Sequence, residues 1–187
     1  AGFGNQALAF AERAHLIPDA AGGAPAAPDA AAARPWLIVN PLSFRASRNG
    51  LAGRVADLAR SHGLHVELAS DLIEFHAVLD KLRALRAEQI WVLAGDGTLH
   101  AMAQHLARPD NAGWSPALLL LAGGRANVVP RDCGGYPPWE RFRAALQALQ
   151  EGRPLLEESL VTLRVEQEGS EPQHGFFMVG AVLYDGV

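Results

Sequence analysis

Short apolar segments alternate with segments of helical periodicity through the middle of the chain, and this alternation limits the fold more strongly than any other feature. The apolar segments, each typical of a strand, are residues 36–39, 64–69, 90–94 and 118–121. Apolar side chains recur at helical spacing in residues 51–61, 72–85, 99–106 and 138–150. Because helices separate the strands, crossover connections join them and they lie mainly parallel. We therefore predict an α/β fold, a Rossmann-like three-layer sandwich whose sheet is covered on both faces.

The two ends of the chain differ from this central region. Residues 20–33 contain nine Ala and two Pro, and the prolines exclude a continuous helix, so this segment is a linker. Residues 5–16 are predicted to form a short amphipathic helix before it. Residues 155–167 and 176–184 are typical of two strands joined around Gly169, the start of an antiparallel unit. We expect three regions, which are the helix and linker (1–34), the α/β domain (35–153) and the beginning of a β-rich lobe (154–187).

Composition and charge exclude several classes of protein. The longest apolar stretch is six residues, 117–122, against roughly 20 needed to cross a bilayer, so a transmembrane protein is excluded. The start of the chain lacks the basic and apolar blocks of a secretory signal, and the single cysteine, Cys133, fits a reducing compartment, so we expect a cytoplasmic protein. The net charge is −4 and no run of basic residues occurs, so we expect no nucleic-acid partner.

Three predicted loops share one edge of this sheet and carry the polar residues of interest. They are residues 40–48, 95–98 and 123–132, and each follows a predicted strand. Strands of a parallel sheet end at the same edge, and open α/β sheets bind their ligands there. We therefore expect the three loops to form one site.

The middle loop has the features of a phosphate site. Gly95 and Gly97 let the backbone approach an anion, and Thr98 adds a hydroxyl group just before a helix. Asp96 would repel a bare phosphate but suits Mg²⁺, so the loop favours a magnesium nucleotide. The loop is neither a Walker A motif nor the GxGxxG fingerprint of dinucleotide sites. Taken alone, it is equally compatible with a plain tight turn that caps a helix.

Taken in order, these loops resemble the catalytic domain shared by diacylglycerol kinases, sphingosine kinases and bacterial lipid kinases, which is distantly related to NAD kinase. The resemblance covers residues 36–187 and rests on Asn40 and Pro41, on residues 95–100 and on the glycine-rich loop that contains Asn127. It implies a two-lobed kinase that binds Mg-ATP above its α/β domain and transfers the γ-phosphoryl group to a lipid hydroxyl. The acceptor would be diacylglycerol or a related lipid, so the full protein would contact the inner face of a membrane peripherally.

The resemblance also implies roles for individual residues of this chain. It implies that Asp96 is the catalytic residue and the magnesium ligand. Ser70 matches its family position loosely, while Arg45 and Arg48 are equally compatible with a solvated loop. Contacts to ATP or its Mg²⁺ are implied for Asn40, Ser43, Arg45, Ser70, Gly95, Gly97, Thr98, Gly123, Gly124, Arg125 and Asn127.

Some positions depart from the family pattern. Ala94 replaces a usual glycine, Arg125 replaces a usual threonine, and Val128 stands where many members have Asp. Arg125 could reach a phosphate, or it could occupy the nucleotide site and block it. The family's acidic general base lies beyond the equivalent of Val187, so we expect weak or no lipid kinase activity from these 187 residues alone.

Two alternative functions stay open on the sequence. A degenerate member of the family would bind nucleotide, or nothing, and serve as an interaction module, which Arg125 favours and residues 95–98 oppose. An NAD kinase-like phosphotransferase is the other alternative, against which Asn40 and Pro41 argue. We also expect a homodimer, because the predicted strands near the end of the chain would expose unpaired hydrogen-bonding edges.

Overall fold

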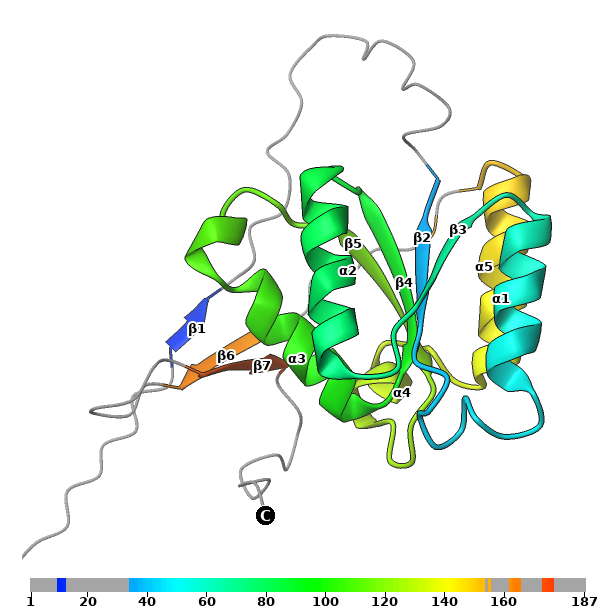
Figure 1. Cartoon of the computed structure of the whole chain (residues 1–187), viewed down its shortest axis with the longest axis horizontal. Helices are drawn as coiled ribbons and strands as arrows, with labels where there is room; N and C mark the ends of the chain where they lie inside the picture. The colour runs from blue at the N-terminus through cyan, green and yellow to red at the C-terminus, as the bar shows by residue number, and fades with distance from the viewer. Residues whose placement is uncertain (1–9, 13–33, 154, 156–161, 166–172, 177–187) are drawn as a thin grey trace, which may run out of the picture.

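A computed structural model describes residues 10–12, 34–153, 155, 162–165 and 173–176 of the chain. Strands and helices alternate over most of this length, as predicted (Figure 1). Within these ranges, none of the helices combines the length and the apolar character needed to cross a membrane. The elements in chain order are β1 (Phe10–Glu12), β2 (Trp36–Val39), α1 (Leu51–Ser61), β3 (His65–Leu68), α2 (Leu72–Ala84), β4 (Gln89–Ala94), α3 (Asp96–Leu106), the 3₁₀ turn η1 (Pro109–Asn111), β5 (Ala117–Ala122), α4 (Val128–Asp132), α5 (Pro138–Gln150), β6 (Thr162–Val165) and β7 (Gln173–Phe176).

The central sheet has four strands in the order β3-β2-β4-β5, and every neighbouring pair is parallel. Figure 1 shows α1 and α5 on one face of this sheet and α2 and α3 on the other. The arrangement confirms the predicted three-layer α/β sandwich. It also places the carboxyl ends of all four strands at one edge.

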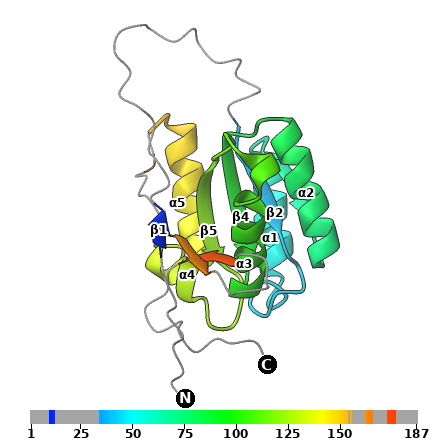
Figure 2. The same cartoon turned by 90° about the vertical axis from the view of Figure 1, so that its left-hand side faces the viewer.

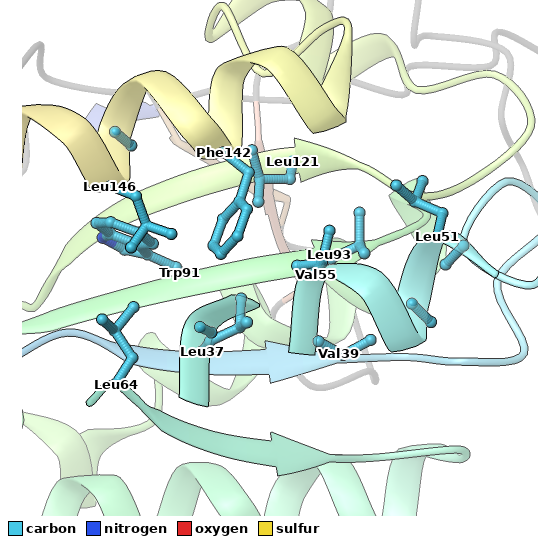
Figure 3. Close-up of a cluster of buried hydrophobic side chains, with 14 residues drawn as sticks. Leu37, Val39, Leu51, Val55, Leu64, Trp91, Leu93, Leu121, Phe142 and Leu146 are labelled. Carbon is cyan, nitrogen blue, oxygen red and sulfur yellow. The ribbon is translucent and has the colours of Figure 1, made fainter. Parts of the chain in front are cut away.

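Each face of the central sheet has its own apolar core, because alternate residues of a strand point to opposite faces. On one face, Leu37 and Leu93 pack with Val55 of α1 (Figure 3). The Trp91 ring meets the Phe142 ring of α5 edge to face, with ring centroids 5.9 Å apart. The other face buries Ile38, Ile90, Val92 and Leu120 beneath the apolar side chains of α2 and α3.

The start of α2 is capped by a side chain, that of Asp71. The Asp71 carboxylate accepts a hydrogen bond from the Glu74 N–H at 2.8 Å, and the Glu74 carboxylate accepts one from the Ser70 N–H at 2.7 Å. This pair of bonds satisfies backbone donors that the helix itself leaves free. Ser70 is thereby held just beyond the carboxyl end of β3.

A second, smaller sheet contains β1, β6 and β7, all antiparallel, in the order β1-β6-β7. The pairing of β6 with β7 confirms the expected antiparallel unit, and β7 contacts α3 (Figure 2). The second strand of this hairpin is Gln173–Phe176, earlier than predicted. The remainder of the predicted strand, residues 177–184, lies outside the described residues.

The predicted N-terminal helix over residues 5–16 is wrong at Phe10–Glu12, which form the strand β1. Pairing with β6 satisfies the backbone groups of this segment, whereas an isolated helix of this length is marginal in water. The pairing also covers an edge of β6 that the sequence was expected to expose, because β6 now has a partner on each side. The expected homodimer therefore loses one of the edges on which its prediction depended.

Candidate functional site

Backbone hydrogen bonds join the predicted loops at the carboxyl edge of the central sheet. The N–H groups of Arg45 and Ala46 both donate to the carbonyl oxygen of Gly123, at 2.7 and 3.0 Å. The Asn40 N–H donates to the carbonyl of Leu93, the last residue but one of β4, at 3.0 Å. The loops after β2, β4 and β5 thus form one connected surface.

Glycines allow two of these loops to touch through their backbones. A Cβ atom on Gly124 would lie 2.5 Å from the Cα of Gly95, and one on Gly123 would lie 2.8 Å from the backbone nitrogen of Ala94. Neither position has room for a side chain, because real Cβ contacts are longer than this. Gly97 differs, since nothing lies within 4 Å of its Cβ position, and the space above it is open.

The helix α3 begins at Asp96, three residues before the predicted start at Leu99. Residues 96–98 are therefore the first turn of a helix rather than a free turn, and Gly95 caps that helix in an extended conformation. Gly95 has no side chain with which to cap the helix, and among the described residues no side chain bonds to the first backbone N–H groups, which also lack an intrahelical partner. The Asn40 amide nitrogen donates to the Thr98 hydroxyl oxygen at 3.3 Å, which links β2 to this turn.

The Asp96 side chain reaches from α3 to the next loop. Its Oδ1 atom accepts a hydrogen bond from the Val129 N–H at 3.2 Å. Val129 lies in α4, a short helix within the stretch that was predicted to be irregular throughout. The second carboxylate oxygen, Oδ2, remains able to act as a ligand, since a carboxylate accepts through both oxygens.

Within the described ranges, no group of three or more His, Cys, Asp or Glu side chains gathers to hold a metal ion. Magnesium that accompanies a nucleotide needs only one or two protein carboxylates, with phosphate oxygens and water completing its shell. Asp96 by itself therefore fits a nucleotide-borne Mg²⁺ and does not fit a metal ion held by protein ligands alone.

The buried side chain of Asn127 holds the loop after β5 through hydrogen bonds. Its side chain is fully buried, and its backbone is left-handed with φ 55°. Oδ1 accepts from the Gly124 N–H at 2.6 Å, and Nδ2 donates to the Gly124 carbonyl at 2.8 Å. Both side-chain atoms are thus committed to Gly124, so Asn127 positions the glycine that touches Gly95.

The other predicted site residues are Ser43, Arg45, Ser70 and Arg125. Ser43 Oγ lies 4.0 Å from the Cβ position of Gly95, beside the glycine contact. Arg45 and Arg125 lie at the same edge, but each guanidinium is placed over an aromatic ring, as described below. Ser70 lies in the loop after β3, where its backbone N–H donates to the Glu74 carboxylate of α2.

Sequence reasoning missed two aromatic residues of this edge. The Arg45 guanidinium lies 5.2 Å from the centre of the Tyr136 ring, and the Arg125 guanidinium lies 4.6 Å from the centre of the Phe44 ring. Phe44 and Arg45 are adjacent in the sequence. Tyr136 is 91 positions away from Arg45, so only the fold brings these two side chains together.

The chain is similar to known proteins in its sequence and its fold. A family model described as the diacylglycerol kinase catalytic domain matches residues 34–160. A crystal structure assigned as a diacylglycerol kinase from Bacillus anthracis str. Sterne is 21% identical with a TM-score of 0.50, and the match covers 64% of this chain and 40% of that one. A second diacylglycerol kinase structure from the same organism is 23% identical with a TM-score of 0.48, covering 64% and 42%. Among curated proteins, none matches the chain.

The chain spans about two fifths of the length of both solved proteins. At this identity, the first structure supports the α/β fold alone. The family model carries more weight, because its match takes in more than half of the chain and includes every loop described above. The predicted resemblance is confirmed, and the chain belongs to the diacylglycerol kinase catalytic domain family.

Proposed function

We propose that this chain is the nucleotide-binding part of an ATP-dependent lipid kinase. It binds Mg-ATP at the carboxyl edge of the central sheet, and the γ-phosphoryl group passes to the hydroxyl of a membrane lipid, diacylglycerol or a relative. The observation that carries the nucleotide part is the uncapped start of α3 beside the contact of Gly95 with Gly124. A helix start of this kind offers several N–H donors and a positive dipole end to phosphate oxygens.

The first turn of α3 supplies the phosphate contacts in this proposal. The N–H groups of Asp96, Gly97 and Thr98 point away from the helix and donate to phosphate oxygens. The open space at Gly97 leaves room for the phosphates, because no atom from outside its own turn of α3 lies within 4 Å of its Cβ position. The same open space supports the interpretation that Arg125 does not block this turn.

Asp96 is the residue that would hold the magnesium ion. Bound Mg²⁺ supplies neutralisation of the charge that develops on the phosphate oxygens during transfer. The Val129 N–H fixes the Asp96 carboxylate through Oδ1, so Oδ2 is presented in a defined direction. Asn40 orients the Thr98 hydroxyl, and Arg45 adds positive charge near the phosphates.

The lipid side of the proposal rests on the family. A lipid acceptor implies peripheral contact with a membrane, at the inner face if the protein is cytoplasmic. The family resemblance places the acidic general base outside residues 1–187, so we propose that this chain alone phosphorylates lipid weakly or not at all. Without a base to accept the hydroxyl proton, binding and positioning persist but the acceptor is not activated.

A matched pair of glycine substitutions tests the nucleotide site. Gly97→Glu puts a carboxylate at the first turn of α3, where a helix tolerates negative charge but a phosphate does not. Gly53→Glu makes the same change in the first turn of α1, where a Cβ also meets nothing within 4 Å. In titration calorimetry, the parent and Gly53→Glu should bind Mg-ATP, and Gly97→Glu should lose binding while remaining folded. Equal binding by both variants would contradict the site.

A further inference from the structure

Four arginines gather in pairs around two aromatic rings at the carboxyl edge. Arg48 and Arg125 lie 3.7 and 4.6 Å from the centre of the Phe44 ring. Arg45 and Arg131 lie 5.2 and 4.8 Å from the centre of the Tyr136 ring. The two rings flank the end of β5, because the Phe44 loop bonds to Gly123 and the residue before Tyr136 bonds to Ala122. We call these four arginines with Phe44 and Tyr136 the arginine cluster.

The arginine cluster has no acidic partner among the described residues. The ion pairs there involve other basic side chains, and none of the four cluster arginines has a carboxylate oxygen within 4.0 Å. Asp132, next to Arg131, is exposed and takes part in none of these pairs, while Asp96 is bonded to Val129. Arginines that share a ring in this way repel one another, and an external anion would relieve that repulsion.

Two exposed apolar side chains lie in the segments that carry the cluster arginines. Leu42, in the loop that carries Arg45 and Arg48, is 71% exposed, and Val128, at the start of α4, is 38% exposed. Arginines among exposed apolar side chains are typical of surfaces that lie in the headgroup region of a bilayer.

We propose that the arginine cluster and Leu42 form a docking surface for an anionic phospholipid bilayer. The inference rests on the proposed function in one respect, since a kinase with a lipid acceptor must reach a membrane with its phosphate-binding edge. The charge of the chain supports a contact through this surface alone. The chain as a whole carries a net charge of −4, so an anionic bilayer would repel most of the rest of its surface. A nucleic acid would use the arginines but would gain nothing from an exposed leucine in the same loop.

Vesicle binding by the full chain, measured without nucleotide, tests the proposal. The chain should sediment with vesicles that contain phosphatidylglycerol and phosphatidylcholine, should bind less as salt is raised, and should not bind vesicles of phosphatidylcholine alone. Each arginine near an anionic surface contributes about 1 kcal/mol, so the double variant Arg48→Gln/Arg125→Gln should bind about 30-fold more weakly. The matched control is Arg60→Gln/Arg86→Gln, which removes the same charge at the opposite edge and should bind as the parent does.

A second variant separates a bilayer from other polyanions. Leu42→Ser keeps every charge, and it should weaken binding to anionic vesicles without changing any binding to a single-stranded RNA. The proposal is overturned if the two double variants bind vesicles equally, if Leu42→Ser leaves vesicle binding unchanged, or if RNA or inorganic phosphate displaces the vesicles at matched charge concentration. A parent that binds Mg-ATP but not anionic vesicles overturns this inference alone. A parent that binds the vesicles but not Mg-ATP contradicts the proposed function instead.

Discussion

The Asp96 carboxylate accepts a hydrogen bond from the backbone N–H of Val129, at 3.2 Å from Oδ1. This bond ties the first turn of α3 to the first turn of α4, and so fixes the loop after β4 against the loop after β5. Asp96 therefore has a structural role beside the proposed role as magnesium ligand. The two roles can be separated, because asparagine keeps an acceptor oxygen and loses the charge.

Substitution of Asp96 should show both roles. Asp96→Ala leaves the half-buried Val129 N–H without its partner and should lower the free energy of unfolding by about 1–2 kcal/mol. Asp96→Asn keeps the bond and should unfold within about 0.5 kcal/mol of the parent. Urea denaturation measures both values. Equal losses for the two variants would show that the charge of Asp96, and not its hydrogen bond, supports the fold.

Alanine at Gly124 should damage the site, whereas alanine at Gly97 should not damage the fold. A Cβ on Gly124 would lie 2.5 Å from the Cα of Gly95, so the two loops must move apart, at a cost of about 1–3 kcal/mol. Gly97 lies within α3 with open space around its Cβ position, and Gly97→Ala should leave stability unchanged or raise it by up to about 1 kcal/mol. Thermal unfolding of the two variants compares them directly, and a destabilised Gly97→Ala would contradict the open space.

Asn127→Ala removes both hydrogen bonds that hold Gly124 and should cost about 2–3 kcal/mol of unfolding free energy. Part of any loss comes from the left-handed backbone, which alanine adopts less readily than asparagine. Asn49→Ala is the control, because Asn49 has a similar φ of 50° but is exposed. Only the excess loss of Asn127→Ala over Asn49→Ala reports the hydrogen bonds. No excess would show that these bonds contribute little to the loop.

Stability should fall as the solution is acidified, because of a buried histidine between α2 and α3. The His105 side chain is 1% exposed, and burial lowers its pKa, an effect that Arg108 and His76 reinforce and that Asp80 and Asp110 oppose. A histidine whose pKa is lower in the folded state stabilises the fold fully above its unfolded pKa of about 6.5, and less as pH falls below it. Urea denaturation from about pH 7.5 down to about pH 5.5 should show this loss.

Two variants assign that pH dependence to His105. His105→Leu cannot take up the proton and should flatten the profile. Asp80→Asn removes the carboxylate whose oxygen lies 3.5 Å from His105 Nε2, which lowers the pKa of His105 further and should steepen the loss. An unchanged slope in His105→Leu would assign the effect to the other histidines.

The parallel sheet could be predicted because its signals are local. Each strand is a short apolar segment, Asp71 caps α2, and Pro138 begins α5 where the sequence placed it. Local signals failed where distant backbone supplied the partner. Phe10–Glu12 have helical spacing, yet β6 takes them as a strand.

The site was predicted in its parts but not in its contacts. The glycine, aspartate and threonine of residues 95–98 indicated phosphate binding, but nothing near them in sequence showed that Gly95 touches Gly124 or that Asp96 bonds to Val129. The start of α3 was placed too late because two glycines were taken as evidence of a turn. The arginine cluster could not be predicted for a similar reason, since its members are separated by up to 92 positions in the sequence, from Phe44 to Tyr136.

The most direct test of the central claim is thermal unfolding with and without Mg-ATP, in the parent and in Asp96→Asn. A ligand at 100 times its dissociation constant stabilises the folded state by about 2.7 kcal/mol, which in a chain of this size raises Tm by about 5–10 °C. The account predicts such a rise in the parent and a much smaller one in Asp96→Asn, which keeps the Val129 bond but lacks the charge that holds magnesium. An equal rise in both proteins, or none in the parent, would contradict a magnesium nucleotide site at the start of α3.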